Sequence, residues 1–378
     1  MKTLLINGRV LRSDGIFYEN CPLIWEDGRF TGIGTSDCDA DTQVIDARGR
    51  TVLPGLIDVH THGRAGFDFS TASVEQMQVM KDSYLAGGVT TVFPTLASDT
   101  AKGWEQAISR VQAVGFDGIH LEGRYLNPTK RGAHPTHLLA PLDPAELDDF
   151  LGLIRIPCHI TAAFELDHDG SFAECALRHG ATLGLGHTAA SAHEARLALS
   201  RGVTAFTHLF NAMPPLHHRE GGAVAVALCE EGYGELIVDG MHICPDMISL
   251  AYRCLGKERT VLITDSMEAT GCADGEYAIA GQPVVVKDGK ALTLDGVLAG
   301  STLNLWDAVK NLMRFASVPF ADAVRCATLN PAMEVGIERF VGSIEVGKRA
   351  DLVLVDENTM TVEGVIQNGR VAIGLKGD

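Results

Sequence analysis

The sequence is poor in positive charge. It has 31 lysines and arginines against 48 aspartates and glutamates, and its formal net charge is −17. An extended nucleic-acid surface needs clustered cations, so this balance argues against that class of function. It does not exclude an anionic small molecule as ligand, because a single local arginine can bind a phosphate group.

Paired cysteines and long apolar runs are also missing. The nine cysteines are scattered and include no Cys-x-x-Cys pair, which fits free thiols in a reducing compartment better than a disulfide framework. No apolar run approaches membrane-spanning length, and the apolar run near the first residues is too short for a signal peptide. We therefore expect a cytoplasmic protein.

The middle of the chain alternates between short apolar segments and helical patterns. Hydrophobic residues make up 46% of the sequence, which is enough to bury a large core. Eight predicted strands alternating with helices indicate an α/β protein with a (β/α)8 TIM-like barrel. The predicted strands are 53–62, 88–96, 117–123, 158–165, 181–187, 204–212, 234–240 and 259–266. The predicted helices are 73–87, 100–114, 170–179, 191–201, 245–256, 301–316 and 320–329.

Both ends of the chain have a different pattern, with short apolar segments separated by glycine-containing turns. The tetrapeptide Asn-Gly-Arg-Val occurs near both ends, at 7–10 and again at 368–371. We expect residues 1–52 and 340–378 to build one small β-sandwich domain, and residues 53–339 to form the barrel. A glycine-rich stretch at 271–296 predicts a hairpin-like insertion after the eighth strand.

Ionisable side chains stand at the ends of several predicted strands. His60 and His62 end the first strand, and their spacing places both imidazoles on one face. Barrel active sites lie at the C-terminal ends of strands, so these histidines should meet the side chains that end the later strands. Those side chains are Glu122, His187, His208, Asp239 with His242, and Asp265.

This set of donors suits a divalent metal. Imidazole and carboxylate ligands together fit zinc, iron, manganese or cobalt, and a catalytic site keeps one position open for water. Glu122 can bridge two ions, with the first-strand histidine pair on one side and the histidines of strands five and six on the other. Water activated there loses a proton near neutral pH, and Asp265 is placed to pass that proton to a leaving group.

Each of these residues also has a simpler interpretation when it is taken alone. A single histidine at a strand end is more often packed or solvated than a metal ligand, and Asp265 alone could cap a helix. Ligand-type residues at five strand ends are difficult to explain in this way. We expect the other histidines of this region to be structural or solvated: His120, His159, His168, His179 and His193.

Several motifs resemble one enzyme family. The segment PGLIDVHTHG at 54–63 is similar to the first metal motif of the amidohydrolase superfamily. Further segments resemble, more narrowly, its N-acetylglucosamine-6-phosphate deacetylase family, and the resemblance covers essentially the whole chain. These segments are LEGRYLNPTKRGAH from 121, GHT from 186, THLFNAMPPLHHRE from 207, VDGMHI from 238, LITDSM from 262 and LAGSTLNL from 298.

The resemblance implies metal-dependent hydrolysis of the acetamido group of N-acetylglucosamine 6-phosphate, which gives glucosamine 6-phosphate and acetate. It implies one or two divalent ions per subunit, with zinc expected and iron, manganese or cobalt as alternatives. Asp265 matches the general base and acid, and His134 matches a residue that contacts the substrate and polarises the amide carbonyl. The implied metal ligands are His60, His62, Glu122, His187 and His208.

The resemblance also implies contacts to the sugar phosphate. Asn211 and the backbone of Ala212 match phosphate contacts, and His242 matches a further contact to the sugar phosphate. Arg219 matches an arginine that the family presents from the neighbouring subunit. The resemblance therefore implies a homodimer in which Arg219 reaches the active site of the partner.

The chain departs from the family pattern at three places. Arg124 and Tyr125 stand where proline and an aromatic residue are common, and no proline precedes Glu165. Ser266 and Glu268 stand where small apolar residues are usual. Arg124 could touch the ligand or face solvent, and the charge of Glu268 could alter substrate preference. These departures leave N-acetylgalactosamine 6-phosphate open as the substrate.

Two other functions have sequence features against them. Cyclic amidases of the superfamily usually bridge their metals with a carboxylated lysine on strand four, and the predicted fourth strand at 158–165 contains no lysine. A non-catalytic barrel that serves as a scaffold would be expected to have lost metal ligands. Here all five candidate ligands and the aspartate are present.

Overall fold

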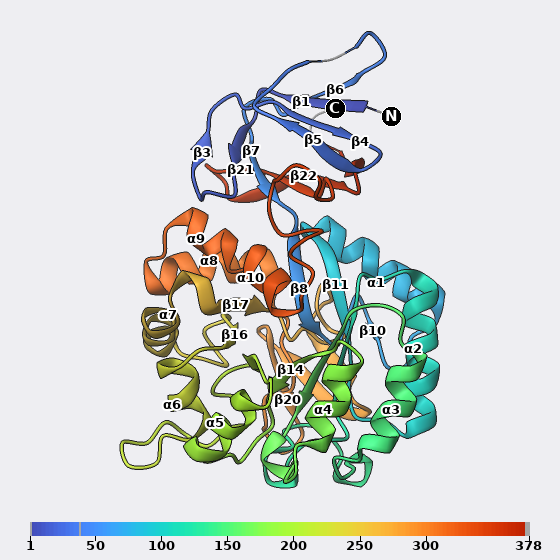
Figure 1. The fold of residues 1–378 in the computed structure, drawn as a ribbon, viewed down its shortest axis with the longest axis vertical. Helices are drawn as coiled ribbons and strands as arrows, with labels where there is room; N and C mark the ends of the chain where they lie inside the picture. The colour runs from blue at the N-terminus through green and yellow to red at the C-terminus, as the bar shows by residue number, and fades with distance from the viewer. Residues whose placement is uncertain (1, 38, 375–378) are drawn as a thin grey trace.

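The computed structural model describes residues 2–37 and 39–374. Residue 1 and residues 375–378, which we assigned to the small β domain, lie outside the described residues, as does residue 38. Figure 1 shows two parts, with the first and last strands together at the top and the barrel with its helices below. This arrangement confirms the predicted fold class.

The barrel is an eight-stranded parallel sheet in which neighbours in sequence are neighbours in space. It is closed between the last and first strands by a parallel bridge from Thr61 to Ser266 and by the bond from the Asp265 N–H to the His60 carbonyl, 2.9 Å long. All eight predicted strands are confirmed. They are β8 Leu56–Thr61, β11 Val89–Leu96, β12 Ile119–Glu122, β13 Cys158–Ala162, β14 Thr182–Leu185, β15 Ala205–Phe206, β16 Tyr233–Ile237 and β17 Thr260–Ile263.

Helices surround this sheet. The seven predicted helices are present, although the last one ends at Arg325 rather than 329. Three of them start at side-chain caps, which are Ser73, Thr100 and Ser191, and Ser73 forms a capping box with Gln76. They are α1 Val74–Ala86, α2 Ala101–Val114, α4 Ser171–Arg178, α5 Ala192–Ser200, α7 Pro245–Arg259, α8 Leu305–Ala316 and α9 Phe320–Arg325. Three further helices were not predicted, namely α3 Pro144–Leu153, α6 Gly222–Cys229 and α10 Leu329–Glu334.

The strands from the two ends of the chain form two sheets. One has the order β5-β4-β1-β6 and the other β23-β22-β21-β7-β2-β3, so β21 and β7 join the ends of the chain in one antiparallel ladder. Leu5, Trp25, Phe30 and Leu352 belong to the core that the sheets share. The strands are β1 Lys2–Ile6, β2 Arg9–Leu11, β3 Phe17–Tyr18, β4 Leu23–Glu26, β5 Arg29–Ile33, β6 Gln43–Asp46, β7 Thr51–Pro54, β21 Leu352–Asp356, β22 Thr361–Gln367 and β23 Arg370–Ile373. The exact domain boundaries stay a prediction.

Smaller elements decorate the barrel. The predicted hairpin-like insertion contains one strand more than a hairpin, because β18 Gly275–Ile279, β19 Gln282–Lys287 and β20 Lys290–Thr293 form a three-stranded antiparallel sheet. A two-stranded ribbon, β9 Gly63–Arg64 with β10 Phe67–Asp68, follows β8. Single turns of 3₁₀ helix are η1 Pro128–Lys130, η2 Thr136–Leu138 and η3 Phe164–Leu166.

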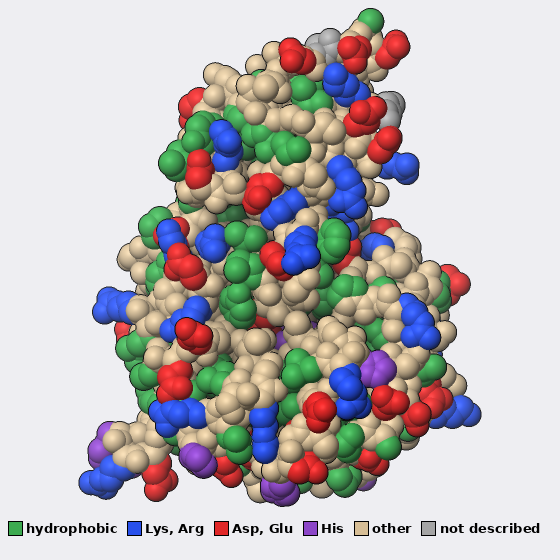
Figure 2. All heavy atoms as spheres, in the orientation of Figure 1, with side chains coloured by type: hydrophobic (Ala, Val, Ile, Leu, Met, Phe, Trp, Pro, Cys, Tyr) green, Lys and Arg blue, Asp and Glu red, His purple; other side chains and the backbone are tan. Residues whose placement is uncertain are grey.

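The surface shown in Figure 2 has acidic and basic side chains interspersed, with no continuous basic stripe on that face. This agrees with the charge balance of the sequence. Within residues 2–37 and 39–374, none of the helices combines the length and the apolar character that crossing a bilayer requires.

Candidate active site

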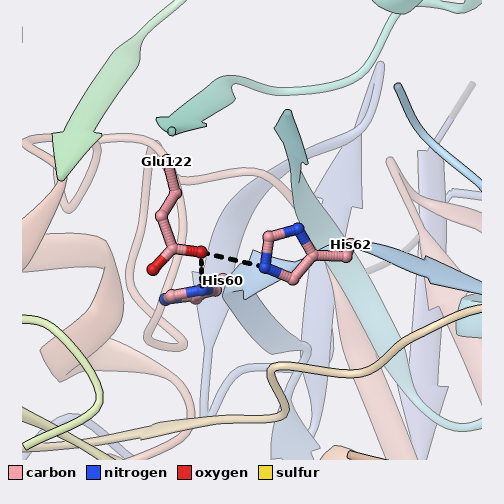
Figure 3. Close-up of side chains that lie close together, drawn as sticks. All are labelled: His60, His62 and Glu122. Carbon is pink, nitrogen blue, oxygen red and sulfur yellow. Dashed lines mark hydrogen bonds and ion pairs between the residues drawn. The ribbon is translucent and has the colours of Figure 1, made fainter. Parts of the chain in front are cut away.

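Glu122, the last residue of β12, lies at the centre of a group of buried histidines. Its Oε2 atom is 3.0 Å from Nε2 of His60 and 2.9 Å from Nε2 of His62 (Figure 3). Its Oε1 atom is 3.2 Å from Nε2 of His187 and 2.9 Å from Nε2 of His208. The four histidines come from β8 and from the ends of β14 and β15. One carboxylate therefore faces two separate pairs of imidazole nitrogens.

The donor set fits a metal ion. Nδ1 of His187 is 2.8 Å from the Lys130 carbonyl, which can only accept a hydrogen bond, so the ring proton of a neutral His187 lies on Nδ1. Its Nε2 lone pair then faces both Glu122 and the Nε2 atom of His208, which is 3.1 Å away. A cation between these atoms removes the repulsion, and neighbouring ligands of one ion with bonds of about 2.0–2.2 Å lie roughly this far apart. This buried cluster is therefore the candidate metal site of the barrel.

Asp265, which follows β17, completes the group. Its Oδ1 atom is 3.3 Å from Nε2 of His62 and 3.7 Å from Nε2 of His60. Burial alone raises the pKa of Asp265, but the hydrogen bond from His62 and the charge of His60 lower it to about 2. Burial likewise opposes ionisation of Glu122, yet the surrounding imidazoles, His60 first, hold its pKa well below the usual range. Both carboxylates are therefore ionised at neutral pH.

The backbone turns sharply where three of these side chains enter the site. His187, His208 and Asp265 have φ angles of 46°, 32° and 47°, in the left-handed region that residues with a side chain rarely adopt. Such strain persists only where the surrounding structure fixes it, and it gathers at functional sites. Here the Asp265 N–H is bound to the His60 carbonyl at 2.9 Å, and the Asp265 carbonyl accepts from the Ser301 N–H at 2.7 Å.

Glu235 contacts His60 and His208 from the interior of the barrel, and it was not predicted from the sequence. Its Oε2 atom is 3.1 Å from Nδ1 of His60 and accepts the backbone N–H of His208 at 3.1 Å. This carboxylate orients the imidazole of His60 and keeps the Nε2 atom of that ring toward Glu122. The sequence did offer one clue. Glu235 stands within the short strand β16, and a charged residue in a buried strand is normally paired or bound to a metal ion.

A cavity of about 320 Å³ opens beside the metal cluster. His134, Asn211, Ala212 and His242 all line it, as the predicted substrate contacts should. One wall is apolar and comes from the insertion and the segment after it, with Ile279, Val297, Leu298, Ala299 and Gly300.

His134 is prepared to donate a hydrogen bond into this cavity. The Ser98 hydroxyl accepts the Arg124 N–H at 3.0 Å, so its own proton is free to go to Nδ1 of His134, 2.9 Å away. The ring proton of His134 then lies on Nε2. Burial lowers the pKa of His134 to about 3. His134 is thus a neutral donor at physiological pH.

Asp239, which also follows the seventh barrel strand, holds the imidazole of His242 in place. The Nδ1 atom of His242 is 2.6 Å from Oδ2 of Asp239. The other oxygen of Asp239 accepts the backbone N–H groups of Met241 and His242. Asp239 therefore fixes the loop and the imidazole that line the cavity, and does not itself line it.

Other charged residues of interest lie away from the cavity. Arg219 is exposed in the segment before α6 and does not line the cavity of its own subunit. Arg124 donates to the Asp99 carbonyl at 2.8 Å and pairs with Glu146, so it is part of the framework and does not face solvent. Glu268 accepts the backbone N–H of Ala278 and lines a neighbouring pocket.

Lys130 was not predicted and does line the cavity. Its Nζ atom is 3.3 Å from the Met213 carbonyl, one residue after Ala212. Among the described residues that line the cavity, it is the one lysine or arginine. The sequence did place this lysine in the segment between two predicted site residues, Glu122 and His134.

The histidines expected to be structural or solvated fall into two groups. The rings of His120 and His159 are buried in the barrel interior, where His120 bonds to Thr161 at 2.8 Å and His159 to Thr182 at 2.8 Å. The other three, His168, His179 and His193, are exposed. The placement of His120, His168, His179 and His193 agrees with the expectation, whereas Nε2 of His159 has no hydrogen-bond partner among the described residues.

The model of the amidohydrolase family matches residues 51–372 of this chain. The chain belongs to the amidohydrolase family. Among the relatives of this amidohydrolase, the N-acetylglucosamine-6-phosphate deacetylase of Vibrio furnissii is 33% identical, over 92% of this chain and 89% of the relative. The N-acetylgalactosamine-6-phosphate deacetylase of Escherichia coli is 34% identical, over 87% of this chain and 89% of the relative.

Solved structures of related enzymes have the same overall fold as this amidohydrolase. The N-acetylglucosamine-6-phosphate deacetylase of Pasteurella multocida has a TM-score of 0.91 and 27% identity, and the match covers 99% of this chain and 100% of that one. A mutant of the Mycobacterium smegmatis deacetylase, in complex with N-acetyl-D-glucosamine-6-phosphate, has a TM-score of 0.89 and 31% identity over 98% of this chain and 99% of that one.

Proposed function

We propose that this amidohydrolase hydrolyses the acetamido group of N-acetylglucosamine 6-phosphate, giving glucosamine 6-phosphate and acetate. The observation that carries the proposal is the Glu122 carboxylate held between two imidazole pairs, with the ionised Asp265 beside it. The relatives named above support the choice of an amino-sugar phosphate as substrate.

The residues of this chain divide the chemistry of amide hydrolysis between them. Glu122 and the four histidines would hold a divalent ion, which would supply the Lewis acidity that polarises a carbonyl group and activates water. Asp265 accepts the proton of the attacking water and returns it to the amine nitrogen as the C–N bond breaks. His134, neutral and with its proton on Nε2, donates to the carbonyl oxygen.

We propose zinc as the metal, with iron, manganese or cobalt as alternatives, because a mixed imidazole and carboxylate set suits each of these ions. The two imidazole pairs beside Glu122 would allow the site to hold two ions. His60 and His62 would hold the first ion, and His187 and His208 the second.

The phosphate group needs donors in a site that already holds two carboxylates. We assign the amide of Asn211, the backbone N–H of Ala212 and the imidazole of His242 to it, and we add the ammonium group of Lys130. Arg219 is assigned to the phosphate of a neighbouring subunit in a homodimer. Its exposed position in the segment before α6, away from the cavity of its own chain, supports this assignment.

A second candidate substrate is N-acetylgalactosamine 6-phosphate. It is favoured by the Escherichia coli relative, whose identity of 34% is similar to that of the N-acetylglucosamine-6-phosphate deacetylase of Vibrio furnissii, at 33%. The two sugars differ at one hydroxyl group, so the same metal site and phosphate contacts serve both.

Acetate release from four sugars tests the proposal. The zinc-loaded enzyme is given N-acetylglucosamine and N-acetylgalactosamine, each with and without the 6-phosphate, and a chelated sample serves as the control. We expect N-acetylglucosamine 6-phosphate to have the highest kcat/KM and the chelated sample to be inactive until zinc is restored. Preference for the galactosamine epimer would select the second candidate. Activity that survives thorough chelation would refute the metal-dependent chemistry.

A further inference from the structure

A second group of ligand-type side chains lies in the barrel interior, beneath the proposed active site. It consists of His159 on β13, Glu235 on β16 and Glu334, the last residue of α10. Their side chains are fully buried, and their ligand atoms all lie within 4.8 Å of one another. His60 separates this group from Glu122, because its Nε2 atom faces Glu122 and its Nδ1 atom faces Glu235.

Four polar atoms of this group have no hydrogen-bond partner among the described residues. They are Nε2 of His159, Oε1 of Glu235 and both carboxylate oxygens of Glu334. Buried polar atoms are almost always paired, and an unpaired buried charge is far more costly than a neutral group. Four unpaired atoms in one place therefore indicate a bound species that satisfies them together.

The distances favour a shared central atom over direct pairing. Nε2 of His159 is 3.8 Å from Oε1 of Glu235, which is too long for a hydrogen bond. Two ligands of one ion with bonds of about 2.0–2.2 Å lie roughly 3–4.4 Å apart. Nδ1 of His159 is 2.8 Å from the Thr182 hydroxyl, and donation of its proton there leaves the Nε2 lone pair toward the carboxylates.

The carboxylates of Glu235 and Glu334 also favour a bound cation. In the part of the chain that the structure describes, neither Glu235 nor Glu334 forms a salt bridge with a lysine or an arginine. Buried charges in proteins are normally paired or coordinate a metal ion.

We propose that His159, Glu235 and Glu334 hold a divalent transition-metal cation in the barrel interior, at a site separate from the Glu122 cluster. One imidazole and two carboxylates are ligands that zinc, iron and manganese accept. The ion neutralises the two acids and, through Glu235, steadies the imidazole of His60. The proposal does not depend on the identity of the sugar substrate.

Anomalous diffraction from crystals of the zinc-loaded protein tests this site directly. We expect a peak about 2.0–2.2 Å from Nε2 of His159, in addition to those beside Glu122. In parallel, metal analysis after zinc loading should give one ion per subunit fewer for Glu334→Gln and for His159→Gln than for the parent. The matched control is Glu338→Gln on the same segment, which should bind as much zinc as the parent.

The alternative occupant is a water molecule beside a protonated Glu334. A map with no anomalous peak between the three side chains would overturn the proposal, and so would equal zinc content in the parent and in Glu334→Gln. If the substituted proteins fail to fold, the anomalous map of the parent still decides. Peaks beside Glu122 without one beside His159 would refute the interior site and leave the proposed function intact.

Discussion

Asp265 is the residue on which the proposed chemistry most depends, because its charge is maintained in a buried position and its backbone is held in a rare conformation. Asp265→Asn removes the proton acceptor but keeps the shape of the side chain. We expect turnover to fall by roughly two to four orders of magnitude while the bound metal stays near the parental amount. Steady-state acetate release and metal analysis measure the two effects.

The control for this substitution is Glu268→Gln. Glu268 is an acid near the same end of the barrel, but it lies against a neighbouring pocket. This variant should keep turnover close to that of the parent. Near-parental turnover of Asp265→Asn would remove that aspartate from the mechanism.

In the proposed function, Lys130 and Arg219 would contact the phosphate group of the substrate from two different places. Loss of one charge-assisted contact costs about 1.5–3 kcal/mol, so Lys130→Met should raise KM for the 6-phosphorylated sugar about ten- to a hundred-fold. Arg219→Ala should act in the same direction, from the partner subunit. KM for the sugar without phosphate should hardly change in either variant.

The exposed Lys102 on α2 offers a matched lysine control, and Lys102→Met should behave as the parent. If Lys130→Met distinguished phosphorylated from plain sugar as well as the parent does, the assignment of Lys130 would be wrong. The same result for Arg219→Ala would contradict the proposed contact across a dimer.

At the scale of elements, the end of β12 lies unusually close to the segment after β11. A Cβ atom on Gly123 would lie 2.4 Å from the Ser98 nitrogen and 2.6 Å from the Ser98 Cα. Backbone atoms cannot move aside as a flexible side chain does, so Gly123→Ala should displace both Glu122 and the Ser98 hydroxyl that holds His134. We expect weaker metal binding and a large loss of activity, measured by metal titration and acetate release.

Gly152 provides the comparison, because a Cβ atom there would meet nothing within 4 Å and the residue lies in α3. Gly152→Ala should leave activity unchanged and stabilise the protein by about 0.5–1 kcal/mol. Parental metal affinity in Gly123→Ala would show that the two strand ends separate more easily than this packing implies.

The barrel strands were predictable because short, largely apolar segments alternate with helical patterns along this part of the chain. The three missed helices had weaker or different signals. α6 is composed almost wholly of small and apolar residues and is buried on most sides, so it shows no helical alternation. α3 did carry a signal, since Asp143 caps it and Pro144 stands at its first turn. α10 contains Pro331 and spans only Leu329–Glu334.

The metal cluster was predictable because a parallel barrel brings the ends of its strands to one mouth. The structure brings His60, His62, Glu122, His187, His208 and Asp265 together there. Glu235 and Lys130 were missed because their roles depend on which way a single side chain points. The sequence pattern alone does not give that direction, and the same holds for Arg124, which the structure places in the framework.

At the scale of the whole molecule, buried neutral histidines make the fold sensitive to acid. The pKa of His134 is lowered by burial to about 3, whereas the unfolded chain has an ordinary histidine pKa near 6.5. Below about pH 6.5 the unfolded state binds more protons than the native state, so stability is lost as the pH falls from about 6.5 to 3. Substitution by a residue that does not titrate removes this contribution.

We therefore expect His134→Gln to reduce the loss of unfolding free energy between pH 7 and pH 5 by about 2 kcal/mol. Urea denaturation at the two pH values measures this change. The exposed His193 supplies the control, because His193→Gln should keep the parental difference. An unchanged difference in His134→Gln would mean that this imidazole is protonated or rearranged in the native state at pH 5.

The ladder between β7 and β21 has a consequence for the order in which the molecule assembles. These strands are separated by about 300 residues, and closing so long a loop is slow, whereas each barrel strand pairs with the next one along the chain. On a ribosome, β7 can pair with β2 early, but β21 is made only when nearly the whole chain has been synthesised. Pulse-labelled hydrogen exchange during refolding should therefore find the amides of β12 and β13 protected before those of β21.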